Sequence, residues 1–256
     1  MTSQGPMTDC ACGLTTGYTL TADDGAWKAT PCECVVRCFN CGGSGWVTRD
    51  LEGVPFEIRC GVCTFKRGIA ARITAAGIAG RYVLGPIEPW SKEQRAVMRW
   101  LKSAVIGQKK GAVLAGPAGV GKTQVAVWAL WTLLTDHGAR VRYRHQRQVF
   151  QGLKLAMDGQ EGGTAAVILD LTSAPVLLWD ELDEPSSEWQ RSILAEVFDL
   201  RYQAGKQTIV TTNLSEDRIG DVWGYAGPRM LSRLSEWCPI VGMGGPDLRQ
   251  HKGGER

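Results

Sequence analysis

The sequence lacks any hydrophobic run long enough to cross a membrane, and it lacks an apolar segment at its N-terminus. The longest apolar stretch, Val125–Leu134, is much shorter than the ~20 residues that a bilayer-spanning helix needs. Residues Met1–Asp9 are polar, without the apolar centre of a secretory signal. We therefore expect a cytoplasmic protein without membrane contact. Thiols stay reduced in the cytoplasm, so metal binding explains the nine cysteines better than disulfides do.

Charge of one sign is also scarce. The chain has 29 Lys and Arg residues against 26 Asp and Glu residues, a net charge of +3. This balance permits nucleic-acid binding without indicating it, because clustered charge is the useful signal. Basic residues do gather at 59–72 and alternate along one strand face at 140–147, and either group could contact phosphates, with Trp46 and Phe65 stacking on bases. A solvated surface is the alternative explanation of both groups.

Aliphatic side chains are few in residues 1–66, so this segment cannot bury enough apolar surface to fold without help. It holds eight of the nine cysteines, and a bound metal would supply the missing stability. Cys38 and Cys41 form one CxxC pair, and Cys60 and Cys63 form a second. Four thiolates at ~2.3 Å would make a closed tetrahedral Zn²⁺ site. The pattern predicts a small zinc-binding module.

The other four cysteines of this segment form two CxC pairs, a spacing less typical of zinc knuckles. They could build a second zinc site from Cys10, Cys12, Cys32 and Cys34. One zinc site with spare cysteines, or a different partition of ligands, are the alternatives, since Cys34 and Cys38 are close in sequence. The glycines that follow Cys41 give CxxCxGxG, which resembles the knuckle of the DnaJ cysteine-rich domain, although no His-Pro-Asp motif is present.

From Gly68 onward, predicted helices alternate with short apolar runs, which is typical of βα units and a parallel sheet. Ser91 with Gln94, and Ser187 with Gln190, form capping boxes that predict two helix starts. The strands are expected at 111–115, 141–145, 176–179, 207–212 and 239–241, and further helices at 91–105, 123–135 and 149–157.

The segment Gly116–Thr123 fits the phosphate-binding pattern G-x-x-x-x-G-K-[ST] and lies between a predicted strand and a predicted helix. Its glycines let successive N–H groups point at phosphate oxygens, and the helix N-terminus adds partial positive charge. Lys122 would reach the β- and γ-phosphates, and the Thr123 hydroxyl would ligate Mg²⁺. The residues expected to bind the nucleotide are Gly116, Pro117, Ala118, Gly119, Val120, Gly121, Lys122 and Thr123.

Two acids follow the apolar run Val176–Trp179. We expect Asp180 to hold Mg²⁺ through water and Glu181 to act as the general base on the attacking water. Asp183 and Glu184 follow closely, and a solvated acidic turn is the alternative. Asn213, at the tip of the next predicted strand, is a candidate for sensing the γ-phosphate.

Three segments follow one another along the chain: the phosphate-binding loop Gly116–Thr123 (the P-loop), Asp180-Glu181 and Thr211-Thr-Asn213. Their order resembles that of the AAA+ ATPases, in particular the DnaC-type replicative-helicase loaders and the IstB-type transposition helpers. Residues 76–82 resemble the lead-in of these loaders. The resemblance implies that Arg229 reaches the γ-phosphate of a neighbouring subunit, with Arg233 as the fallback, and that Arg249 touches the phosphates of its own subunit. An exposed pair of arginines on a helix is the alternative for Arg229 and Arg233.

We therefore predict a P-loop AAA+ core of the α/β class, with a parallel sheet flanked by helices. Its parts would be a zinc-binding module at 1–67, a linker and helix at 68–110, and an ATPase core lacking a full C-terminal lid at 111–256. The predicted function is ATP-dependent loading of a replicative helicase onto single-stranded DNA by a self-associating protein that uses ATP, Mg²⁺ and Zn²⁺. A transposition helper and a non-hydrolysing zinc adaptor are the alternatives.

Overall fold

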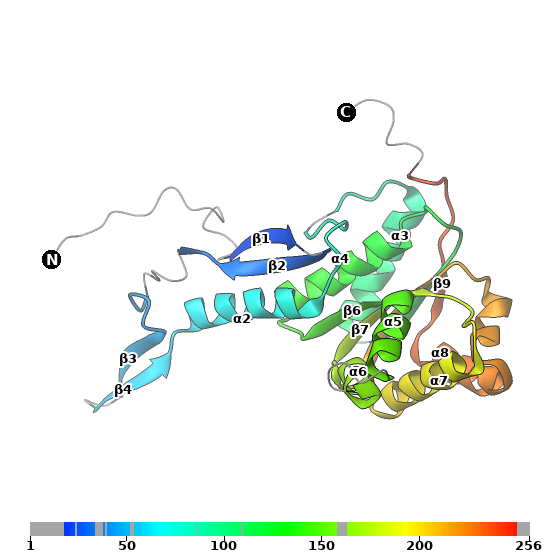
Figure 1. Ribbon diagram of the computed structural model, residues 1–256. Helices are drawn as coiled ribbons and strands as arrows, with labels where there is room; N and C mark the ends of the chain where they lie inside the picture. Colours follow the sequence, from blue (N-terminus) through cyan, green and yellow to red (C-terminus); the bar gives the residue numbers. More distant parts are fainter. Residues whose placement is uncertain are drawn as a thin grey trace. The chain divides into compact units, whose positions relative to one another are not determined.

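A computed structural model describes residues 18–23, 25–33, 38, 40–51, 54–85, 87–108, 110–157 and 163–249 (Figure 1). The chain divides into two compact units, the first ending at Arg81 and the second beginning at Tyr82. The module boundary expected at residue 67 lies inside a continuous helix, α2 (Gly61–Ala76). No helix within the described ranges is long and apolar enough to cross a membrane.

The first unit consists of two hairpins and one helix. Strands β1 (Tyr18–Asp23) and β2 (Ala26–Pro31) pair antiparallel, as do β3 (Trp46–Leu51) and β4 (Val54–Arg59). Helix α2 runs alongside β1 and β2 (Figure 1). Buried aliphatic residues of and beside α2 form a small core: Ile69, Ala70, Ile73, Ala76 and Ile78. The first unit therefore has more regular structure than we expected from its small number of aliphatic residues.

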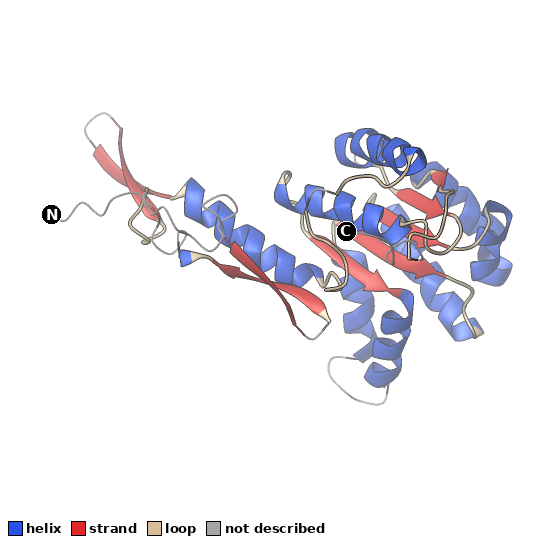
Figure 2. Ribbon diagram, turned by 90° about the horizontal axis from the view of Figure 1, so that it is seen from above, coloured by secondary structure: helices blue, strands red, loops and turns tan. Residues whose placement is uncertain are grey.

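The second unit is an α/β fold built on a five-stranded parallel sheet in the order β6-β7-β8-β5-β9. Helices cover both faces of the sheet (Figure 2). The strands are β5 (Ala112–Ala115), β6 (Val141–His145), β7 (Val176–Leu182), β8 (Gln207–Thr212) and β9 (Ile240–Gly242). The helices are α3 (Lys92–Leu101), η1 (Lys102–Gly107), α4 (Lys122–Thr135), α5 (Gln146–Met157), α6 (Gly163–Ser173), α7 (Glu188–Gln203), η2 (Glu216–Ala226) and α8 (Gly227–Trp237). The predicted fold class is confirmed.

Both capping boxes start helices where the sequence places them. The Ser91 hydroxyl accepts a hydrogen bond from the Gln94 N–H at 3.1 Å, and the Ser187 hydroxyl accepts one from the Gln190 N–H at 3.3 Å. The helix behind Ser91 ends in a π-helical turn, η1, before β5 begins. Short predicted strands and helices thus fall at their expected places along the chain.

The core behind the sheet is aromatic. Trp179 on β7, Phe198 on α7 and Trp223 on η2 pack edge to face, with ring centroids 5.5 and 5.6 Å apart. All three side chains are buried. Because Trp179 precedes the two acids of β7, this packing fixes the strand from which those acids extend.

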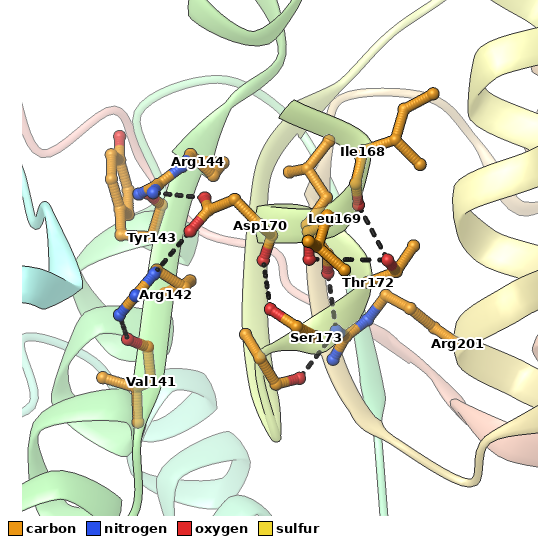
Figure 3. A network of polar contacts seen from close by, with 12 residues as sticks. Val141, Arg142, Tyr143, Arg144, Ile168, Leu169, Asp170, Thr172, Ser173 and Arg201 are labelled. Atoms are coloured by element: carbon orange, nitrogen blue, oxygen red, sulfur yellow. Dashed lines mark hydrogen bonds and ion pairs between the residues drawn. The ribbon is translucent and has the colours of Figure 1, made fainter. Parts of the chain in front are cut away.

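A polar network ties α6 to the sheet (Figure 3). Arg142 and Arg144, on one face of β6, both contact the carboxylate of Asp170 on α6. Burial raises the pKa of Asp170, but the two guanidinium groups outweigh it and hold that pKa below its usual value. These two members of the basic group at 140–147 are therefore ion-paired within the chain. Basic residue Arg59 of the first group lies over the ring of Trp46, 5.6 Å from its centroid, while the side chain of Phe65 lies outside the described residues.

Candidate nucleotide site

The loop Gly116–Thr123 joins β5 to α4, as the phosphate-binding pattern requires. Gly119 and Gly121 have φ angles of 85° and 87°, a region that side chains disfavour. A Cβ at Gly119 would lie 1.9 Å from an oxygen of Asp247. The loop therefore needs glycine for its backbone and for the close approach of the C-terminal segment. Its backbone amides precede the N-terminus of α4, an arrangement that suits an anion.

Lys122 is buried in this loop, with 7% of its surface exposed. Its ammonium group donates to the carbonyls of Gly116 and Pro117 at 2.8 and 2.7 Å and to Oδ1 of Asn213 at 2.8 Å. Burial, together with the charge of Arg249, lowers the pKa of Lys122, whereas Glu181 and Asp180 oppose that shift. The predicted P-loop lysine and the predicted strand-tip asparagine are thus brought into direct contact.

Asp180 is fully buried, and hydroxyl groups surround it. Its Oδ1 accepts hydrogen bonds from Thr123 and Thr211, both at 2.7 Å. Its Oδ2 accepts one from Tyr143 at 2.7 Å and a longer one from Tyr82 at 3.4 Å. Burial and the charge of Asp180 raise the pKa of Tyr143, so its phenol remains a donor. The structure therefore joins the two expected magnesium ligands, Thr123 and Asp180, directly.

Glu181 leaves the regular strand. The pairing of β7 with β8 shifts register between Trp179 and Leu182, and Glu181 has a φ angle of 58°. Its carboxylate points to His145, whose Nε2 lies 2.8 Å from Oε2. Nδ1 of His145 accepts the Arg147 N–H at 3.2 Å, which places the proton of a neutral imidazole on Nε2. Asp180 and Glu181 are adjacent in sequence but differ in environment, since Asp180 is enclosed while Glu181 is about half exposed.

The segment after β9 returns to the phosphate loop. The Leu248 N–H donates to the Gly119 carbonyl at 3.0 Å. Nε of Arg249 lies 3.4 Å from an oxygen of Asp247, and its charge is close enough to lower the pKa of Lys122. Arg249 is thus near the loop that the resemblance assigns to it.

Arg229 and Arg233 both lie on α8 but in different surroundings. Arg229 is exposed, and within the described part of the chain it forms no ion pair. Arg233 is ion-paired with Asp199 on α7, and its guanidinium lies 5.3 Å from the ring centroid of Tyr202. The fallback candidate Arg233 is therefore engaged within its own chain, whereas Arg229 is exposed at the surface of α8.

Comparison with known protein families assigns the second unit to a family. The sequence model of IstB-like ATP binding proteins matches residues 89–255, which is more than half of the chain. The chain belongs to the IstB-like ATP-binding family. No curated protein matched it.

Solved structures resemble the IstB-like chain over about the same length. The DnaC helicase loader is 26% identical, with a TM-score of 0.54, over 64% of this chain and 98% of that one. DnaI is 20% identical, with a TM-score of 0.55, over 64% and 92%. The replication initiator DnaA bound to AMPPCP and single-stranded DNA is 19% identical, with a TM-score of 0.52, over 62% and 49%. The last two show the fold alone.

Three cysteines of the first unit form a candidate metal centre in this IstB-like protein. The Sγ atoms of Cys38, Cys41 and Cys60 lie within 4.8 Å of one another, and those of Cys38 and Cys60 are 3.7 Å apart. Sulfurs at ~2.3 Å from a tetrahedral zinc are about 3.8 Å apart, so the spacing fits the ion. Gly45 N–H donates to Cys41 Sγ at 3.3 Å, and the Asn40 amide donates to Cys60 Sγ at 3.3 Å. Such donors stabilise bound thiolates.

The remaining predicted zinc ligands are described only in part. Cys63 lies in α2, and its side chain is outside the described residues, as are Cys10, Cys12 and Cys34. Cys32 is buried and does not belong to the three-cysteine cluster. Burial raises the pKa of Cys38, so a cation would be needed to keep that thiolate charged. Cys238 is a buried core thiol whose pKa burial also raises.

Four side chains of the IstB-like site were not found from the sequence: Tyr82, Tyr143, His145 and Thr211. Tyr143 and His145 lie in β6, where no motif marks them, whereas Tyr82 and Thr211 belong to segments of the resemblance that assigned them no role. Gln94 was found only as a capping residue. Its side chain also accepts from the Trp90 N–H at 2.8 Å and donates to the Val120 carbonyl at 3.0 Å, which ties the start of α3 to the phosphate loop. The capping pattern on its own carries no signal for that second role.

Proposed function

We propose that this protein hydrolyses ATP at the site between β5, β7 and β8. Residues Gly116–Thr123 would hold the triphosphate, and Thr123 and Asp180 would hold Mg²⁺. Bound there, Mg²⁺ would supply positive charge that stabilises the negative charge of the phosphates. The observation that carries the proposal is the joined set of contacts in which Thr123 donates to buried Asp180 while Lys122 donates to Asn213. A merely acidic surface turn would not enclose Asp180.

Glu181 would act as the general base on the attacking water. Its exposed carboxylate can meet a water molecule, whereas buried Asp180 has its oxygens occupied by hydroxyl donors. His145 orients the carboxylate through the Nε2–Oε2 contact of 2.8 Å. Asn213 would contact the γ-phosphate from the tip of β8, and Arg249 would contact the phosphates from the C-terminal segment.

The test is ATP turnover by the wild type and by Glu181→Gln, each with and without single-stranded DNA. We expect Glu181→Gln to bind nucleotide normally and to turn over at least about 100-fold more slowly, because a positioned base contributes about 10² to 10⁴. Glu184→Gln, which removes a nearby exposed carboxylate, is the matched control and should keep its turnover. Turnover at the background level in both proteins would indicate a nucleotide-binding adaptor that does not hydrolyse ATP, whereas equal rates above background would show that Glu181 is not the base.

We further propose that ATP turnover drives the loading of a replicative helicase onto single-stranded DNA. The likeness to the DnaC helicase loader, over 98% of the chain in that solved structure, supports this function. A transposition helper is the second candidate, and the family match supports it. Affinity purification with ATP or ADP separates them, because a loader would retain a hexameric helicase whereas a transposition helper would retain a transposase.

For the first unit we propose a structural Zn²⁺ held by Cys38, Cys41, Cys60 and Cys63. The second site predicted from Cys10, Cys12, Cys32 and Cys34 is also a proposal, and only Cys32 of that set lies in the described residues. Metal analysis of the purified protein should give one or two zinc ions per chain. Cys32→Ser should leave one ion if two sites exist, and should leave the zinc content unchanged if only the first does.

A further inference from the structure

The side chain of Thr211 contacts both acids of β7. Thr211 lies in β8 and is fully buried. Its hydroxyl donates to Oδ1 of Asp180 at 2.7 Å and accepts from the main-chain N–H of Glu181 at 2.9 Å. A hydroxyl has one proton to give and lone pairs to accept with, so both hydrogen bonds form at once. One oxygen atom therefore links the side chain of the first acid to the backbone of the second.

The bond to Glu181 falls at a strained position. Among the described residues, Glu181 is the only one other than glycine with a positive φ angle. The register shift between Trp179 and Leu182 removes it from the regular pairing of β7 with β8. Its N–H is satisfied by the Thr211 side chain. Strain of this kind persists only where the surroundings hold it, and a buried N–H without a partner is costly.

The bond to Asp180 falls on the oxygen shared with Thr123. Both hydroxyls reach Oδ1 at 2.7 Å, while Tyr143 holds Oδ2. Thr211 thus helps to set the rotation of the Asp180 carboxylate, to which the predicted magnesium ligand Thr123 also donates. Loss of the Thr211 hydroxyl would remove one of the two donors to Oδ1 and would leave the Glu181 N–H without its partner.

We propose that Thr211 is a positioning residue that fixes Asp180 and Glu181 relative to one another for Mg²⁺ binding and water activation. The inference depends on the proposed ATP hydrolysis for its turnover consequence, but not for its consequence on Mg²⁺ binding. The alternative is that Thr211 only satisfies its own hydroxyl within a buried strand. Its neighbour Thr212 does so, since its hydroxyl donates to the Leu182 carbonyl at 2.7 Å and accepts from the Leu214 N–H at 3.0 Å.

The experiment compares Thr211→Val, which keeps the shape and removes the hydroxyl, with Thr211→Ser, which keeps the hydroxyl. The control is Thr208→Val, which removes an equally buried hydroxyl from the other end of β8, where it accepts from Arg201. Each full-length variant is measured for ATP turnover, for KM, and for the Mg²⁺ concentration that gives half-maximal binding of a fluorescent ATP analogue. Thermal unfolding reports the folded fraction of each sample.

We expect Thr211→Val to lower kcat about 10- to 100-fold, with KM for ATP within about threefold, as for lost groups that orient metal ligands. Its Mg²⁺ midpoint should rise severalfold. Thr211→Ser should restore both, and Thr208→Val should lower thermal stability without changing either. Values for Thr211→Val within twofold of the wild type would overturn the inference, as would a Thr211→Ser variant as impaired as Thr211→Val. If the wild type shows no turnover, the proposed hydrolysis fails, and the Mg²⁺ midpoints still decide the role of Thr211.

Discussion

Replacing Lys122 with methionine separates its contribution to ATP binding from its contribution to folding. The ammonium makes three hydrogen bonds of 2.7–2.8 Å within the loop and to Asn213. When ATP binds, two charge-assisted hydrogen bonds from the ammonium to phosphate contribute about 3–6 kcal/mol. The ammonium then loses its hydrogen bonds to the carbonyls of Gly116 and Pro117, which offsets roughly 1–3 kcal/mol of that gain. The net loss is about 3 kcal/mol, or roughly a hundredfold in affinity for Mg-ATP.

The effect on stability should be small by comparison. Burial lowers the pKa of Lys122, so the folded protein already bears a cost for holding this charge. Methionine relieves that cost while leaving three acceptors without their donor, and the two effects offset to within about 1 kcal/mol. We therefore expect near-wild-type unfolding alongside the loss of affinity.

Equilibrium anisotropy of a fluorescent ATP analogue, with Mg²⁺ present, measures the affinity, and urea unfolding measures the stability. Lys154→Met is the matched control, because it makes the same chemical change on the exposed surface of α5. An affinity of Lys122→Met within about threefold of the wild type would refute the assignment of this loop as the phosphate site. A large loss of stability would instead show that the ammonium mainly holds the loop together.

Three further predictions follow from the structure. Arg201 is fully buried and donates to Leu171, Ala174, Gln207 and Thr208, and burial lowers its pKa to about 10. Arg201→Met should lower the free energy of unfolding in urea by about 3–5 kcal/mol, and a loss below about 1 kcal/mol would contradict the importance of this network. Cys60→Ser, or a strong chelator, should release zinc and lower the thermal stability of the first unit while leaving nucleotide affinity unchanged; the idea fails if the zinc content is unaltered. Arg229→Ala should abolish turnover. Mixing it with Glu181→Gln should restore activity, because one subunit would supply the arginine and the other the general base. Rescue of Arg233→Ala in place of Arg229→Ala would show that Arg233 leaves Asp199 to act on the neighbouring subunit.

The elements of the second unit were largely predictable because their signals are local. Strands β6 and β8 have the bounds expected from the sequence, 141–145 and 207–212, and α7 starts directly after its capping serine. Helices α6 and α8 were not predicted as such. Helix α6 has buried Leu171 alone on its inner face, and α8 begins with Gly-Pro. Helix α6 shows no clear helical period in its sequence, whereas α8 has a clear apolar face with Met230 and Leu234 buried, and its helix was considered only as the alternative for Arg229 and Arg233.

The site was predictable where a motif defines it and unpredictable where only the fold brings residues together. Lys122, Thr123 and Asp180 belong to recognisable sequence patterns. In the structure Thr123 contacts Asp180, and Lys122 contacts Asn213. Thr211 and Tyr143 come from separate strands, and their contacts with Asp180 depend on the sheet order β6-β7-β8. The ion pairs of Arg142 and Arg144 depend on the fold in the same way, because their partner Asp170 lies on another element.

The bulge in β7 explains how two neighbouring acids can take different roles. In a regular strand, consecutive side chains point to opposite faces, so Asp180 and Glu181 could not both turn toward the loop after β5. The register shift and the φ angle of 58° at Glu181 change its direction without moving Asp180, whose oxygens stay bound to Thr123, Thr211 and Tyr143. A fixed, enclosed carboxylate suits a metal site, and a partly exposed one held by a single histidine contact suits a base that must meet water. The strained residue therefore lies where the proposed hydrolysis needs its base, and under the same proposal the hydroxyl of the buried Thr211 holds it there.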